Sequence, residues 1–194
     1  MTKKYGIIGN PIKHSLSPIL HNYWFEKYKI DATYSIIELE SNGLPDLINK
    51  IKKRELIGIN ITLPYKQKIV PYVDVLINDA EITSSVNTIY LDEKETIVGE
   101  NTDVFGLQAA YLKEVDNITR KNALVIGAGG VSPSVILALQ KSGVKDISII
   151  NRTKEKCIFL KKKFSNLKVL NWEELKEKIK NYDIIINATS LGLK

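Results

Sequence analysis

The chain has 194 residues, of which 44% are hydrophobic and 26% are charged, and its formal net charge is +6. This composition can fill the core of one large domain or two small ones, which argues against a disordered chain. The positive excess lies in residues 101–194, with 16 Lys and Arg against 9 Asp and Glu. It suits an anionic cofactor, whereas the lysine run 161–163 is more typical of a solvated helix face than of a nucleic-acid site, so no nucleic-acid partner is expected.

Cysteine and histidine are too scarce for several kinds of site. Cys157 is the single cysteine, so no internal disulfide is expected, and it fits a reducing cytosol. His14 and His21 are the two histidines and lack metal-site spacing to other ligands, so no metal is expected. The first apolar run is too short for a signal peptide, and no stretch approaches the length of a membrane span. We therefore expect a cytoplasmic protein without a membrane partner.

Strands and helices alternate along the first hundred residues. Strands are expected at 5–9, 33–39 and 58–61, and helices at 18–28, at the start of 44–57 and at 71–82. Ser17 resembles an N-cap, with Pro18 at the first helical position. Residues 85–90 and 96–98 are expected to form a hairpin around an acidic turn at 92–94. This alternation predicts an α/β domain over residues 1–102.

The segment 122–135, NALVIGAGGVSPSV, is typical of a buried strand that runs through a glycine turn into a helix. Gly127, Gly129 and Gly130 permit backbone angles and close approaches that a side chain would block. The helix that starts near Val131 would direct its first N–H groups at a pyrophosphate. The dinucleotide fingerprint has glycine or alanine at its third position, where this chain has Ser132, which is small enough to keep the helix close to the strand.

The following strand, 146–150, ends in Asn151, Arg152 and Thr153. NAD-binding proteins place a carboxylate here for the ribose 2′-hydroxyl, whereas the guanidinium of Arg152 suits a 2′-phosphate. The sequence therefore predicts NADP(H) as the cofactor.

The remaining elements complete a second domain over residues 103–194. A helix at 104–115 leads into it, and helices at 156–164 and 172–179 and strands at 168–170 and 183–186 follow the glycine turn. A doubly wound sheet usually has six strands, and this one is expected to lack its last two, as in a fragment or a natural truncation. The predicted fold class is α/β: an N-terminal α/β domain followed by an incomplete Rossmann domain.

Polar residues in the first domain gather where strands end, which is where α/β proteins place their sites. They are Ser15, Ser17, Asn60, Thr62, Lys66, Asn87, Asn101, Thr102 and Asp103. Hydroxyl, amide and charged groups in this combination suit a small polyhydroxylated acid as ligand.

The motifs that hold these residues resemble the shikimate dehydrogenase family along the whole chain. They are HSLSP at 14–18, NITLPYK at 60–66, GENTD at 99–103, GAGG at 127–130, NRT at 151–153 and NATS at 187–190. The resemblance implies that the N-terminal domain binds shikimate, that the Rossmann domain binds NADP, and that catalysis takes place in the cleft between them.

The resemblance also implies roles for individual residues. Ser15 and Ser17 would hold the substrate carboxylate, with Asn60 among the substrate-binding residues, and Thr62, Asn87 and Asp103 would contact ring hydroxyls. Lys66 and Asp103 would form the catalytic pair. The cofactor-binding residues would be Gly127, Ala128, Gly129, Gly130, Val131, Asn151, Arg152, Thr153, Asn187, Ala188, Thr189 and Ser190.

The expected reaction is the reversible NADPH-dependent reduction of 3-dehydroshikimate to shikimate in aromatic amino-acid (chorismate) biosynthesis. Hydride transfer to a ketone builds negative charge on the carbonyl oxygen, which needs a proton and a nearby positive group, and Lys66 can supply both. Taken singly, Lys66 could be a surface lysine, Asp103 a helix N-cap, and Ser17 only the cap of its helix.

Three alternatives stay open at this stage. The first is a quinate/shikimate dehydrogenase that uses NAD, against which Arg152 argues. The second is an NADP- or metabolite-binding module without turnover, because family members continue with strands and helices that fold back on the substrate domain. The third is an interaction protein on a Rossmann scaffold, since a fold does not imply a function. The sequence also leaves open whether the chain is a monomer or a homodimer.

Overall fold

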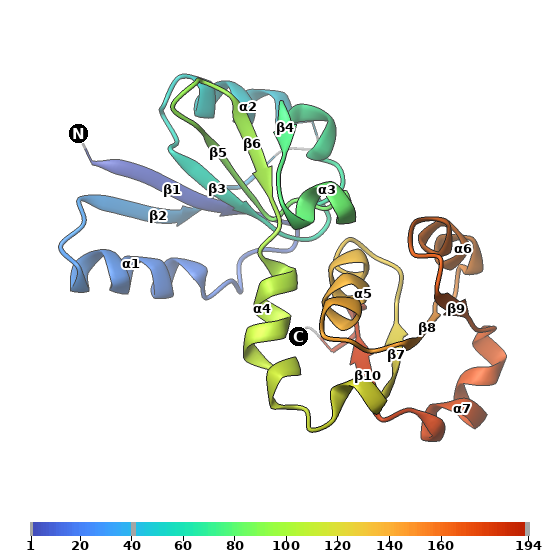
Figure 1. Cartoon of the computed structure of the whole chain (residues 1–194). Helices are drawn as coiled ribbons and strands as arrows, with labels where there is room; N and C mark the ends of the chain where they lie inside the picture. The colour runs from blue at the N-terminus through green and yellow to red at the C-terminus, as the bar shows by residue number, and fades with distance from the viewer. Residues whose placement is uncertain (1, 40–41, 193–194) are drawn as a thin grey trace. The chain divides into compact units, whose positions relative to one another are not determined.

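The computed structural model describes residues 2–39 and 42–192 and confirms the mixed α/β class (Figure 1). The chain divides into two compact units, Met1–Asn101 and Thr102–Lys194. Each unit has its own sheet and its own apolar core. None of the helices in the described part of the chain is long and apolar enough to cross a membrane.

The first unit holds a six-stranded sheet in the order β2-β1-β3-β5-β6-β4. Its elements are β1 (Lys3–Ile8), α1 (Ser17–Lys27), β2 (Ala32–Ile36), α2 (Leu44–Lys52), β3 (Gly58–Ile61), β4 (Val75–Leu76), α3 (Asp79–Thr83), β5 (Thr88–Leu91) and β6 (Ile97–Glu100). Only β5 runs against its neighbours, and the predicted hairpin is confirmed as β5 and β6. The carboxyl ends of β1, β3 and β6 therefore meet the start of β5 at one edge of the sheet.

The two longer helices of the first unit pack differently. The core face of α2 consists of Leu44, Leu47, Ile48 and Ile51, whose helical spacing puts all four side chains into the core. Helix α1 packs along the edge strand β2 and has no fully buried residue. It holds to the sheet through ring contacts, among them Phe25 on Tyr5 at 5.7 Å between centroids.

The predicted helix at 71–82 is wrong. A 3₁₀ turn at Val70–Tyr72 is followed by β4 and by the short helix α3. The backbone N–H of Asp74 donates to the Ile97 carbonyl (2.9 Å), and the Ile97 N–H donates to the Asp74 carboxylate (2.8 Å). These bonds fasten the segment to β6, so pairing with a distant strand overrides the local helical pattern.

The second unit holds a parallel four-stranded sheet in the order β10-β7-β8-β9. Its elements are α4 (Asp103–Ala110), β7 (Asn122–Ile126), α5 (Ser132–Lys141), β8 (Asp146–Ile150), α6 (Lys154–Lys163), β9 (Leu167–Val169), α7 (Leu175–Lys178) and β10 (Ile184–Asn187). Helix α5 buries its residues 132–139 and lies beside α4 (Figure 1). The strand at 146–150 is confirmed with its predicted bounds.

Two predicted helices of this unit are shorter than expected. The helix predicted at 104–115 ends at Ala110, and a 3₁₀ turn follows at Leu112–Glu114. Of the helix predicted at 172–179, only α7 (Leu175–Lys178) is α-helical, and it lies between 3₁₀ turns at Trp172–Glu174 and Ile179–Asn181. The Asn171 side chain and Glu174 form a capping box at the start of this segment, which satisfies its first N–H groups.

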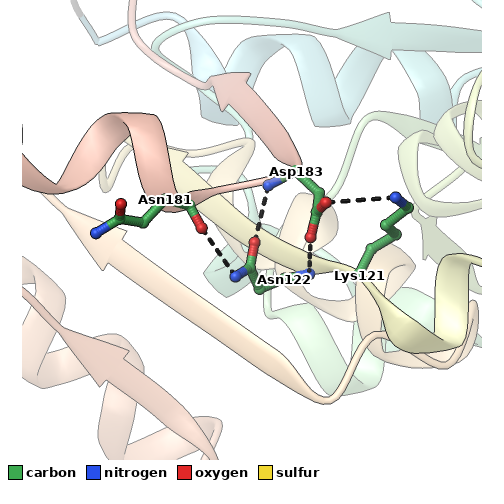
Figure 2. A network of polar contacts seen from close by, with 4 residues as sticks. All are labelled: Lys121, Asn122, Asn181 and Asp183. Carbon is green, nitrogen blue, oxygen red and sulfur yellow. Dashed lines mark hydrogen bonds and ion pairs between the residues drawn. The ribbon is translucent and has the colours of Figure 1, made fainter.

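A polar network joins the starts of β7 and β10 (Figure 2). Asn122 donates from its side chain to the Asn181 carbonyl (3.0 Å) and accepts from the Asp183 N–H (2.8 Å). The Asn122 N–H donates to the Asp183 carboxylate (3.1 Å), and Lys121 donates to its other oxygen (3.3 Å). The Asn122 N–H, and then Lys121, hold the pKa of Asp183 below its ordinary value.

Candidate active site

The predicted substrate residues of the first unit lie at the edge where β1, β3 and β6 end. The loops after β1 and β3 touch each other, because the Thr62 N–H donates to the Ile8 carbonyl (2.9 Å) and the Asn10 N–H to the Leu63 carbonyl (2.8 Å). Gly9 permits this contact, since a Cβ there would lie 2.5 Å from the Thr62 methyl group. The loop with Ser15 and the loop with Lys66 therefore start side by side.

Ser15 and Ser17 lie at the start of α1 and are half-buried. The Ser17 N–H donates to the Ser15 hydroxyl at 3.3 Å. Ser17 is itself the first helical residue, Leu16 precedes it at the N-cap position, and no side-chain cap bond forms there. The expectation that Ser17 caps the helix is therefore wrong; Ser15 binds a first-turn N–H instead.

Lys66 and Asn87 are held at the same edge by backbone hydrogen bonds. The Val86 N–H donates to the Lys66 carbonyl (2.8 Å), which fixes the segment before Asn87 beside the NITLPYK loop. The backbone of Asn87 bridges β3 and β6, because its carbonyl accepts from the Ile61 N–H (2.8 Å) and its N–H donates to the Glu100 carbonyl (3.0 Å). The Lys66 side chain is half-buried, and Asn87 is buried.

The GENTD segment supplies residues of two kinds. Asn101 is buried and donates from its amide to the Ser85 carbonyl (2.7 Å) and to the Thr83 hydroxyl (3.3 Å), so it stabilises the loop before β5. Asp103 is half-buried and is the first residue of α4, whereas Thr102 occupies the N-cap position. Asp103 belongs to the second unit and Lys66 to the first.

The cofactor residues predicted in the second unit lie at the carboxyl edge of its sheet. Gly127 has φ +111°, and a Cβ on it would lie 2.8 to 2.9 Å from Thr189 and Ala188. The Gly127 N–H donates to the Ile150 carbonyl and the Ala188 N–H to the Ile126 carbonyl, both at 2.8 Å. The glycine turn, the NRT segment and the NATS segment are thus joined where β7, β8 and β10 end.

Ser132 locks the glycine turn through its side chain. Its hydroxyl donates to the Gly127 carbonyl (3.0 Å) and accepts from the Gly129 N–H (3.0 Å), and the residue is fully buried. The sequence predicted only that serine is small enough for this position. The hydrogen bonds to the turn were missed, although a hydroxyl three and five residues from turn glycines is a signal that could have suggested them.

The NATS segment is an internally bonded turn. The side-chain Oδ1 of Asn187 accepts from the Thr189 N–H (3.1 Å) and hydroxyl (2.7 Å), and its Nδ2 donates to the Leu191 carbonyl (3.0 Å). Asparagine side chains commonly hold turns in this way. The segment is therefore shaped before any ligand binds.

The second unit fits NADP(H) on observations of its own. Gly129 is exposed, and the nearest atom to a Cβ added there would be a carbonyl oxygen at 3.9 Å, so packing within the protein does not require a glycine at this position. The close approach of a phosphate to the backbone would require one. Arg152 is exposed just beyond β8, where its guanidinium suits a phosphate. A hollow of about 310 Å³ lies at the opposite edge, next to Asn122 and Asp146, and is remote from the glycine turn. Among the described residues, no group of His, Cys, Asp and Glu is arranged to hold a metal ion.

Comparisons with known proteins agree with this arrangement. Residues 7–89 match the family profile of the shikimate dehydrogenase substrate binding domain, and residues 109–192 match that of shikimate / quinate 5-dehydrogenase. The chain is 48% identical over its whole length to a shikimate dehydrogenase (NADP(+)) of Pelagibacter ubique and covers 71% of that protein.

Solved structures give the same relationship. The crystal structure of shikimate dehydrogenase from Aquifex aeolicus matches all of this chain with a TM-score of 0.91 and 38% identity, over 71% of its own length. The Thermus thermophilus enzyme, solved in complex with NADP(H) and shikimate, matches 98% of the chain with a TM-score of 0.83 and 29% identity, over 70% of its length. The chain therefore belongs to the shikimate dehydrogenase family.

Proposed function

We propose that this chain catalyses the reversible NADPH-dependent reduction of 3-dehydroshikimate to shikimate in chorismate biosynthesis, as a cytoplasmic enzyme. Residues 1–102 would form the substrate domain and residues 103–194 the NADP domain. The observation that carries the proposal is the cluster of Ser15, Ser17 and Lys66 with Thr62 and Asn87 at one sheet edge, in a chain of this family. Relatives named as NADP(+)-dependent enzymes support the cofactor.

The residues divide the work by their chemistry. The hydroxyl groups of Ser15 and Ser17 would donate to the substrate carboxylate, and Thr62, Asn60, Asn87 and Asp103 would contact ring hydroxyls. Bound NADPH supplies the hydride. Lys66 would deliver the proton to the carbonyl oxygen and stabilise the charge that develops there, with Asp103 as its partner in acid–base catalysis.

The cofactor contacts follow from the second unit. The turn Gly127–Ala128–Gly129–Gly130 with Val131 would face the pyrophosphate at the start of α5. Asn151, Arg152 and Thr153 would hold the ribose and its 2′-phosphate, because a positive side chain replaces the acid of NAD-binding proteins. Asn187, Ala188, Thr189 and Ser190 would line the nicotinamide side of the same edge.

The proposal is tested by mixing the purified chain with NADPH and 3-dehydroshikimate and following the loss of reduced-nicotinamide absorbance, with NADH in parallel. Turnover that is faster with NADPH is expected. Faster turnover with NADH would instead indicate the quinate/shikimate dehydrogenase subfamily. Size-exclusion chromatography of the same sample separates the monomer from the homodimer.

The Lys66→Ala variant tests the chemical role. We expect it to lower kcat by a factor of about 10² or more, the usual contribution of a general acid, while KM for the substrate changes much less. Equal losses in binding and turnover would show that Lys66 only binds. Lys68→Ala, two residues away on the exposed side of the same loop, is the matched control.

A binding module without turnover is the second candidate, because the chain spans 71% of the length of its Pelagibacter relative. It predicts saturable binding of shikimate or NADP+ by calorimetry and constant absorbance in the assay above.

A further inference from the structure

We propose that Tyr34 and Thr88 form a hydrogen-bond relay through Asn60 that positions two proposed substrate contacts, the amides of Asn60 and Asn87. Tyr34 and Thr88 would then be positioning residues. The inference rests on the proposed function, because Asn60 and Asn87 are proposed substrate contacts. All four residues belong to the first unit.

The relay begins at the phenol of Tyr34, which is 5% exposed. Its hydroxyl donates to the Asn60 Oδ1 at 2.7 Å. Burial raises the pKa of Tyr34 to about 12, and the neighbouring Ser17 side chain lowers it by less, so the phenol stays a neutral donor.

The relay continues through the amide of Asn60. Its Nδ2 donates to the Thr88 Oγ1 at 3.0 Å and to the Asn87 carbonyl at 3.3 Å. The Thr88 hydroxyl donates in turn to the Asn87 Oδ1 at 3.1 Å. This last bond fixes the amide orientation of Asn87, so that its Nδ2 is the end that turns away from Thr88. A ring hydroxyl that meets this end would act as the hydrogen-bond acceptor.

Tyr34 is itself held in place by α1. The Asn22 side chain bonds both the N–H and the carbonyl of Tyr34 at 2.9 Å, which closes the edge of β2. The His21 ring stacks on the phenol ring with centroids 4.2 Å apart and planes 7° apart. Burial lowers the pKa of His21, which favours its neutral form in this stack. Helix α1 therefore fixes the phenol at the start of the relay.

The test compares shikimate affinity, measured by calorimetry on the full chain, among variants that remove one oxygen each. Tyr34→Phe and Thr88→Val are each expected to weaken binding about 5- to 10-fold, the range of one net hydrogen bond. Thr88→Ser restores the hydroxyl and should recover most of the affinity. Tyr90→Phe removes a phenol oxygen from the same strand and face as Thr88, outside the relay, and serves as the control.

Combining Tyr34→Phe with Thr88→Val shows whether the two act through one relay. A single relay predicts that the double variant loses little more than the weaker-binding single variant, whereas independent effects multiply. Unchanged affinity in Tyr34→Phe and Thr88→Val, with lowered thermal stability alone, would overturn the relay and leave only a structural role. Multiplying losses would overturn the coupling. Failure of the unaltered chain to bind shikimate would refute the proposed function itself, and the relay with it.

Discussion

Replacing Ser132 by alanine should destabilise the second unit, although the dinucleotide fingerprint allows alanine at this position. The hydroxyl of Ser132 bridges Gly127 and Gly129. Its loss leaves the buried Gly127 carbonyl without this donor, whereas the exposed Gly129 N–H can turn to water. The Gly127 side of the bridge therefore carries most of the expected effect.

The magnitude follows from these two bonds. Two net hydrogen bonds contribute about 1–3 kcal/mol to the free energy of unfolding. The better helix propensity of alanine returns at most about 0.5 kcal/mol. The expected net loss for Ser132→Ala is therefore about 0.5–3 kcal/mol. In a chain of this size, about 1 kcal/mol corresponds to roughly 2–4 °C, so Tm should fall by about 1–12 °C.

The assay is thermal unfolding followed by circular dichroism, with urea unfolding as a second measure. Ser142→Ala, at the C-cap of the same helix, is the matched control. Its half-buried hydroxyl accepts a 3.3 Å bond from Gln108, so its removal should change the free energy of unfolding by less than about 0.5 kcal/mol. The variant should also bind NADP+ more weakly, since the free turn loses its preorganised shape. A Tm for Ser132→Ala at or above that of the unaltered chain would refute this account of the turn.

Three further predictions concern the second unit. Arg152→Ala should raise KM for NADPH about 10-fold or more and leave KM for NADH nearly unchanged, as steady-state kinetics with both cofactors would show; parallel losses would exclude a role at the 2′-phosphate. The pKa of Asp183 is lowered, so its contribution to the free energy of unfolding is present above its ordinary pKa of 3.8 and is lost as the pH falls below it. Asp183→Asn should therefore make the free energy of urea unfolding depend less on pH in that acidic range. An unchanged pH dependence would contradict this. Burial raises the pKa of Cys157 to about 11, so a thiol reagent at pH 8 should label it only after unfolding, and rapid labelling of the native chain would show that the core opens locally.

The sequence predicted well those elements whose pattern is local. The strand 146–150, DISII, has three isoleucines between the polar residues Asp146 and Asn151, and it forms with these bounds. The helix predicted over 71–82 does not form, because β4 exists only through its pairing with β6. Gly99 leaves room there for the Leu76 and Val73 side chains, since a Cβ on Gly99 would lie 3.1 and 3.2 Å from them. No local pattern carries that information, because the partner strand lies more than twenty residues away.

The candidate site divides in the same way. The motifs placed Ser15, Thr62 and Lys66 on loops that the structure brings to one edge, since parallel strands align their carboxyl ends. They did not indicate Tyr34, which belongs to a strand without a motif, or Thr88, which directly follows Asn87. Both are recognised only from hydrogen bonds to Asn60, which depend on sheet order and not on spacing along the chain.

Asn60 shows how such bonds limit the chemistry of a motif residue. Its nitrogen carries two protons, and both are donated within the protein, to Thr88 and to the Asn87 carbonyl. Its oxygen accepts one bond, from Tyr34, and can accept a second. If Asn60 contacts the substrate as proposed, it must do so as an acceptor from a ring hydroxyl, while Asn87 presents its donor end. Paired acceptor and donor amides would distinguish a hydroxyl from a ketone on the ring, since a ketone oxygen cannot donate to Asn60.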